Sequence, residues 1–184
     1  MLNGSATASA GASDNLSGID TQGCGPLVLN TVGSKTVTCT ATDKAGNSNS
    51  VDASYSVQYA PMGMCQAGPG HQILQPIELT GVSVFQRKQG STAPAKFRVC
   101  DASGASIGTP GVVQDFRIVK IITGTIVDTP NELVDSTTPD AAFRWTGDQW
   151  IFNISTKSLN AGSTYVFQIS LNDGTSIMFQ FGLK

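Results

Sequence analysis

Charged side chains are scarce in this sequence. Asp, Glu, Lys and Arg make up 13% of its 184 residues, against about a quarter of an average soluble domain. The formal net charge is −2, and Lys and Arg form no cluster along the chain. Because affinity for nucleic acids rests mainly on clustered cations that contact phosphates, we expect no nucleic-acid partner.

Helical periodicity and long apolar runs are also absent. No window repeats apolar residues at i, i+3, i+4 and i+7, which is the spacing of an amphipathic helix. No apolar run approaches the roughly 18 residues of a membrane span, so we expect no span in this chain. Residues 1–20 lack the basic and then apolar layout of a signal peptide, and we expect the chain to be cut from a longer one.

The sequence has a single histidine, His71, which lies among glycine and proline residues. A Ser-His-Asp hydrolase needs a histidine held beside a nucleophilic serine, and no serine elbow lies near it, so we predict no enzymatic activity. Two interpretations of His71 stay open. It is a loop histidine bonded to backbone or solvent, which is the commoner case, or a metal ligand whose further ligands are brought by folding.

The four cysteines are Cys24, Cys39, Cys65 and Cys100, and none forms a Cys-x-x-Cys pair of the kind that binds zinc or carries redox chemistry. An even number at wide spacing favours two disulfides in an oxidising compartment over free thiols in a reduced cytosol. Pairing in sequence order places one bond in each half of the chain. A loop of the first size is worth about 3 kcal/mol on the chain-entropy description.

Thr, Ser and Gly take the place of the missing charged residues. β-Branched Thr packs well on a pleated surface, and Gly supplies the positive φ angles of tight turns. Alternating apolar and polar residues therefore predict an all-β protein of two tandem antiparallel β-sandwich domains. In the first half we expect a hairpin of residues 36–42 and 51–59 with one buried face, and weaker strands at 6–12 and 27–29.

In the second half, a half-buried strand surrounds Phe97 and begins near Pro94, since a proline can only start or edge a strand. A surface excursion with one weak strand is expected over residues 124–140. Turns are predicted at Gly147-Asp148 and at residues 172–174. The remaining predicted strands are 73–77, 82–85, 112–122, 143–145, 150–154, 165–171 and 177–183. Seven or so short strands are what an immunoglobulin-like (Ig-like) sandwich needs.

Residues 31–47, which read TVGSKTVTCTATDKAGN, resemble the end of an HYR repeat or a related bacterial Ig-like repeat. The resemblance extends to about residue 59 and implies an Ig-like domain over residues 1–60. In that family the cysteine of this strand pairs with one in the preceding segment, which implies a Cys24–Cys39 bond. Such a repeat is normally longer at its N-terminal end, so this domain is expected to be short or truncated.

Residues 94–97, which read PAKF, and residues 143–159 resemble two motifs of the PxKF module that ends many large bacterial surface proteins. With the final strands, the resemblance covers about residues 65–184 and implies a second Ig-like domain. Residues 61–64 then form a linker between the domains. No general activity is established for that family, so the resemblance implies a location and an architecture only.

We therefore predict a non-catalytic structural or adhesive segment of a bacterial extracellular or cell-surface protein, beside neighbouring Ig-like repeats of the same chain. Two other functions stay open. One is a carbohydrate- or host-ligand-binding module with a protein or glycan partner, and the other is an accessory domain of a secreted enzyme. Sugar binding would use Trp145 and Trp150 as an aromatic platform, although tryptophans of a hairpin more often pack into the core.

Calcium is the one cofactor that the residue types suggest. Two loops that an Ig-like fold could bring to one end carry oxygen-bearing side chains, and hard cations prefer clusters of oxygen. The alternative is that Asp and Asn are simply good turn residues. The candidate ligands are Asp14, Asn15, Asp20, Asp43 and Asn47.

An intramolecular isopeptide crosslink would join Lys96 to Asn153, with Asp101 or Asp115 as the assisting acid. The reaction needs a buried, neutral lysine. Lys96 is expected on the strand face opposite Phe97, where a solvated lysine is protonated and not nucleophilic. Loss of one ammonia from the intact mass would reveal the crosslink.

Overall fold

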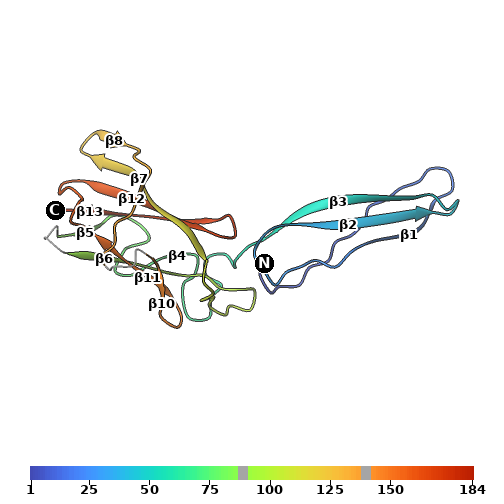
Figure 1. Ribbon diagram of the computed structural model, residues 1–184, viewed down its shortest axis with the longest axis horizontal. Coiled ribbons are helices and arrows are strands. Elements are labelled where there is room, and N and C mark those ends of the chain that lie inside the picture. Colours follow the sequence, from blue (N-terminus) through green and yellow to red (C-terminus); the bar gives the residue numbers. More distant parts are fainter. Residues whose placement is uncertain (87–90, 138–141) are drawn as a thin grey trace. The chain divides into compact units, whose positions relative to one another are not determined.

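The computed structural model describes residues 1–86, 91–137 and 142–184. Within these ranges its regular secondary structure is made of β-strands, which confirms the all-β prediction. The chain divides into two compact units, Met1–Gln58 and Tyr59–Lys184 (Figure 1). We call them unit 1 and unit 2 and describe each by itself.

Unit 1 contains an antiparallel sheet with the strand order β1-β2-β3. β1 spans Ile19–Cys24, β2 spans Gly33–Asp43 and β3 spans Ser48–Val57. β2 and β3 pair over ten successive positions as the Thr-rich alternation predicts. Gly46 in the turn between them has a φ of +89°, a conformation that glycine adopts without steric cost.

Two of the weaker strand predictions in unit 1 are wrong. Residues 6–12 and 27–29 are not strands, whereas Ile19–Cys24, which we did not predict, is one. The sequence of the missed strand, IDTQGC, has no apolar alternation, and four of its six residues are exposed in the structure. Its place in the sheet is set by pairing with β2 rather than by burial of one face.

A second sheet does not form in residues 1–58, all of which are described. The predicted two-sheet sandwich is therefore wrong for this unit. The inner face of the β2–β3 hairpin is thinly covered as well, since Val37 is buried but Val51 is 61% exposed. Residues 5–13 contain only Ser, Ala, Thr and Gly, and such small side chains bury too little apolar area to make a second layer.

Unit 2 is built from two sheets. One has the order β10-β11-β6-β4, and the other has the order β5-β13-β12-β7-β8, with β9 also paired to β7. The first sheet contains β4 Gln72–Leu74, β6 Thr92–Arg98, β10 Arg144–Trp145 and β11 Trp150–Ser155. The second contains β5 Ser83–Phe85, β7 Val113–Thr123, β8 Ile126–Asp128, β9 Glu132–Leu133, β12 Thr164–Leu171 and β13 Ser176–Leu183. β5 and β13 run parallel.

These strands lie where the sequence predicts them, with small differences. The excursion at residues 124–140 holds two short strands, β8 and β9, where one was expected, and its positions 138–140 lie outside the described residues. Pro94 lies inside β6 but beyond the end of β4, so β11 pairs with it on one side only. A proline is tolerated there because no ladder partner needs its missing N–H.

The core of unit 2 lies between its two sheets and is largely aromatic. Phe167 of β12 stacks on Phe179 and Phe181 of β13, with ring centroids 5.0 and 4.8 Å apart. Phe116 of β7 meets Phe152 of β11, from the other sheet, edge to face at 5.0 Å. Pairs of this kind contribute about 0.5–1.5 kcal/mol each beyond the burial of their area.

Tyr165 fixes the corner where the chain changes sheets. Residues 156–163 lead from β11 in one sheet to β12 in the other, and Tyr165 lies at the start of β12 with its side chain buried. Its hydroxyl accepts a hydrogen bond from the Asn160 N–H at 2.6 Å. The corner is therefore tied to the start of β12.

Arg98 is a buried cation at the end of β6. Its guanidinium donates to Asp148 Oδ2 at 2.6 Å and to the Pro69 carbonyl oxygen at 3.2 Å. β6 lies between β11 and β4 in the sheet. Arg98 thus ties β6 to the β10–β11 turn on one side and to the loop that precedes β4 on the other.

Candidate functional site

The first disulfide crosses the ladder between β1 and β2. Cys24 and Cys39 are direct partners in that ladder, and their Cα atoms lie 3.9 Å apart. The two cysteines are 15 positions apart in the sequence, and both are only half-buried. The bond therefore links β1 to the hairpin in a unit that has little apolar core.

The second disulfide, Cys65–Cys100, lies in the interior of unit 2. Cys100 is fully buried and Cys65 is 8% exposed, and their separation in the sequence is 35. Both pack against Ala60, whose N–H donates to the Cys100 carbonyl oxygen at 2.8 Å. The first residues of unit 2 are thus fastened beside the disulfide.

A carboxylate from the β12–β13 turn also holds the start of unit 2. Asp173 is buried, and its Oδ2 atom accepts the Tyr59 N–H at 2.9 Å. Its Oδ1 atom accepts the Thr175 N–H and hydroxyl at 2.9 and 2.6 Å. The Tyr59 hydroxyl donates to Asn172 Oδ1 at 2.8 Å. The sequence predicts a hairpin turn at these residues, but a local Asn-Asp-Gly pattern carries no signal of a distant partner.

The same carboxylate influences two titratable groups. Burial and the charge of Asp173 raise the pKa of Tyr59 to about 12, and the hydrogen bond to Asn172 opposes this. Burial lowers the pKa of His71, and Asp173 opposes that shift. The Nδ1 atom of His71 is buried and lacks a hydrogen-bond partner among the described residues. His71 is therefore a partly buried loop histidine beside a carboxylate.

His71 belongs to no metal-binding group of side chains in the described part of the protein. In residues 1–86, 91–137 and 142–184, no three His, Cys, Asp or Glu side chains gather so that they could hold a metal ion.

Those same ranges contain no helix of the length and apolar character needed to cross a membrane.

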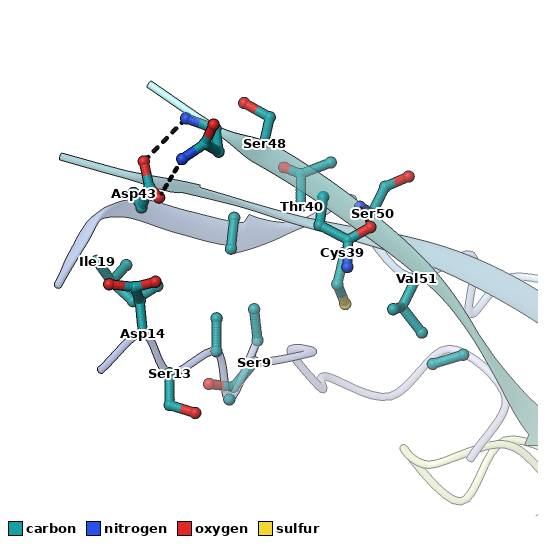
Figure 2. A pocket seen from close by; sticks show the side chains of 17 residues that line it. Ser9, Ser13, Asp14, Ile19, Cys39, Thr40, Asp43, Ser48, Ser50 and Val51 are labelled. Atoms are coloured by element: carbon teal, nitrogen blue, oxygen red, sulfur yellow. Dashed lines mark hydrogen bonds between the residues drawn. The ribbon is translucent and has the colours of Figure 1, made fainter. Parts of the chain in front are cut away.

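A groove of about 530 Å³ opens on one face of the unit 1 sheet. β2 and β3 form one wall, and residues 9–14, which form no strand, run along the other (Figure 2). The lining is mostly small or apolar, and it includes Ala41, Val51 and Cys39. Figure 2 shows the Cys39 sulfur pointing into the space between the two walls.

Three of the proposed calcium ligands, Asp14, Asp43 and Asn47, line this groove, and Asp14 and Asp43 lie at one end of it (Figure 2). Asp14 Oδ1 accepts the N–H groups of Leu16, Ser17 and Gly18 at 3.0, 2.7 and 2.8 Å. These bonds lower the pKa of Asp14. The carboxylate therefore organises the loop in which it lies.

Asp43 has the corresponding role in the β2–β3 turn. It accepts the Asn47 N–H at 2.8 Å and the Asn47 side-chain amide at 2.7 Å, and these bonds lower the pKa of Asp43. Asn15 and Asp20, the other two proposed ligands, are exposed. The hydrogen bonds show that Asp14, Asp43 and Asn47 stabilise turns, and calcium binding stays a prediction.

The proposed crosslink partners share one strand face. In the β6–β11 ladder Lys96 pairs with Ile151 and Asn153 pairs with Pro94, so Lys96 and Asn153 are diagonal neighbours. Their side chains are half-buried and lie opposite the core face of Phe97.

Neither proposed acid is placed beside this pair. Asp115 is on β7 in the other sheet, where it forms an ion pair with Arg117. Asp101 follows β6 and accepts the Ser103 N–H and hydroxyl at 2.9 and 2.6 Å. The structure therefore brings lysine and asparagine together, while Asp115 and Asp101 have partners of their own, and the crosslink stays a prediction.

The two tryptophans pack together on the β10–β11 hairpin, with ring centroids 5.4 Å apart and planes at 56°. Trp150 is buried, and its Nε1–H donates to the Ile107 carbonyl oxygen at 2.9 Å. Trp145 covers Gly108 so closely that a Cβ atom there would lie 2.3 Å from the indole ring. One ring belongs to the core and the other is half-buried against backbone, which is not the open pair that a sugar platform needs.

No family model matches this chain, and no curated protein matches it. Among solved structures, the chain is similar to SGBP-B of the Bacteroides ovatus mixed-linkage glucan utilization locus, in complex with mixed-linkage heptasaccharide. The match has 13% identity and a TM-score of 0.25, and it covers 83% of this chain and 30% of that one. The chain therefore spans less than a third of the structure that it matches. At this TM-score the likeness supports no conclusion about fold or ligand.

Proposed function

We propose that this chain is a non-catalytic structural module of a bacterial secreted or cell-surface protein, and that its unit 2 has an Ig-like fold. The observation that carries the proposal is the fastening of unit 2 at its first residues. Tyr59 is bonded to Asp173, Ala60 is bonded to Cys100, and the Cys65–Cys100 disulfide follows five residues later. A module that transmits tension needs such ties where the chain enters.

The strand order supports the Ig-like assignment. An Ig domain packs strands A, B, E and D against strands G, F and C. In chain order, β4, β6, β10 and β11 take the places of A, B, D and E, and β7, β12 and β13 take those of C, F and G. β5, which pairs in parallel with β13, then continues the first strand on the second sheet.

Tyr165 gives a second, independent support. Ig domains carry a tyrosine near the start of strand F whose hydroxyl bonds to backbone a few residues upstream, two positions before the second conserved cysteine. Tyr165 makes this bond to Asn160, and Phe167 stands at the cysteine position. The ring centroids of Phe167 and of Phe116 on β7 lie 5.9 Å apart. Aromatic packing therefore stands where other Ig domains have a cysteine pair and a neighbouring tryptophan.

The disulfide determines how tension would run through unit 2. Force applied before Tyr59 reaches Cys65 and crosses the S–S bond to Cys100, so the residues between them carry no load. β4, β5 and β6 lie inside that closed loop. These strands stay linked to one another even when the rest of the module is stretched.

The disulfides also support an extracellular or cell-surface location, because such bonds persist mainly in oxidising compartments. The resemblances of residues 1–60 to HYR repeats and of residues 65–184 to PxKF modules belong to the same proposal. They suggest a stalk or a C-terminal segment of a longer surface protein, with neighbouring Ig-like repeats as its partners.

Single-molecule stretching of the oxidised chain tests this function. We expect unit 2 to resist extension and then to unfold in one abrupt step, because its sheets and ties break together. Smooth extension without a force peak would contradict a load-bearing role. In parallel, the chain is screened against immobilised glycans. Retention that is lost in the Trp145→Ala variant would reassign the chain to sugar binding.

A further inference from the structure

The two disulfides differ in their access to solvent. Cys65 and Cys100 are 8% and 0% exposed and lie in the interior of unit 2. Cys24 and Cys39 are only half-buried, and the sheet that carries them has no second sheet over it. A thiol from solution can therefore approach the first bond in the folded protein, whereas unit 2 must open before the second bond is reached.

The groove selects one of the two sulfurs. Cys39 lines the groove and its sulfur points into it (Figure 2), while Cys24 is not among the lining residues. The small side chains around it, such as Ala41 and Ala12, leave open a space of about 530 Å³. We propose that the Cys24–Cys39 bond is a thiol–disulfide exchange site which accepts a small thiol, or the thiol of an extended peptide, on the sulfur of Cys39.

The exchange is balanced without any further reactant. A thiolate in the groove attacks Cys39 Sγ, the bond between the two cysteine sulfurs breaks, and Cys24 leaves as a thiolate that takes a proton from water. The incoming sulfur and Cys39 then share a mixed disulfide, and Cys24 has been reduced. The product carries one new covalent group and one free thiol.

Exchange would loosen β1 and leave unit 2 intact. Four of the six residues of β1 are exposed, and its ties in the described structure are mainly the ladder to β2 and the disulfide. A strand with so little buried surface depends on its crosslink more than a core strand does. We therefore expect faster amide exchange in residues 19–24 after the reaction.

Reduced glutathione is the probe for the test. The folded, oxidised chain is incubated with it, free thiols are trapped with iodoacetamide, and peptides are mapped by mass spectrometry. The expected result is a glutathione adduct on Cys39, an alkylated Cys24, and an unmodified Cys65–Cys100 bond. An adduct chiefly on Cys24, equal reaction of both disulfides, or no reaction before denaturation would overturn the proposal.

A shielding variant makes the test independent of the folding of cysteine mutants. Val51 is the cross-strand neighbour of Cys39 on β3 and is 61% exposed. A tryptophan there suits a strand and covers the sulfur from the groove side. Val51→Trp is expected to slow adduct formation at least about tenfold, whereas the matched Ser54→Trp variant, on the opposite face of β3, keeps the native rate. Equal rates in the two variants would contradict attack from the groove.

Discussion

The N–H of Tyr59 donates a hydrogen bond to the Oδ2 atom of Asp173 across 2.9 Å and 114 residues of sequence. The donor belongs to the first residue of unit 2, and the acceptor belongs to the turn between its last two strands. With Ala60 bonded to Cys100 a residue later, this contact closes unit 2 at the point where the chain enters it.

Replacing Asp173 by Asn should destabilise unit 2 by about 1–3 kcal/mol. Both carboxylate oxygens accept bonds, from Tyr59 and Thr175, so the amide of Asn must turn its own N–H groups toward a donor in either orientation. Urea unfolding followed by tryptophan fluorescence reports on unit 2, since both tryptophans lie there. The exposed Asp128→Asn variant is the control and should stay within about 0.5 kcal/mol of the native protein. Equal midpoints for the two variants would show that the tie contributes nothing.

Tyr165→Phe removes the hydroxyl that accepts the Asn160 N–H. We expect a loss of about 1–2 kcal/mol, because a part-buried donor is left without its partner. The same fluorescence assay measures it. Ser158→Ala removes an exposed hydrogen bond to Asp135 near the same corner and should change stability by less than about 0.5 kcal/mol. If the two variants behave alike, the corner is not held by the tyrosine.

Alkaline pH should weaken unit 2 through Tyr59. Its pKa is raised in the folded chain from 10.0 to about 12, so folding favours the protonated hydroxyl. The resulting stabilisation is complete below about pH 10 and is lost as the pH rises through about 12. Tyr59→Phe lacks this group. The difference in unfolding free energy between the native protein and Tyr59→Phe should therefore shrink from about pH 9 to about pH 11, and a constant difference would refute the shift.

Local sequence patterns predicted the strands that have a two-residue period of burial. The β12–β13 hairpin is the clearest case, since its alternating aromatic residues face the core and its Asn-Asp-Gly turn lies at the expected place. β1 escaped prediction because Asp20, Thr21 and Gln22 bury no face. Residues 6–12 are the opposite case, since Ala alternating with Thr, Ser and Gly imitates a strand but supplies little apolar area to bury.

Contacts between distant residues were beyond the sequence alone. Asp173 and Arg98 appear in it as an ordinary turn residue and an ordinary strand cation. Their functions depend on partners brought by the fold, Tyr59 for the first and Pro69 and Asp148 for the second. The burial of Trp150 agrees with the core packing that is usual for tryptophans of a hairpin, but its hydrogen-bond partner, the Ile107 carbonyl oxygen, could not be predicted from the sequence.

Stretching the chain with and without a reductant tests most directly whether disulfides limit how far these modules extend. The closed loops span 35 and 15 positions, and an extended chain covers about 3.3–3.6 Å per residue. Full reduction should therefore add about 120 Å to the extension released when unit 2 unfolds, and about 50 Å to that of unit 1. If the released lengths are the same under both conditions, or if the oxidised chain extends without a force peak, the load-bearing function is contradicted.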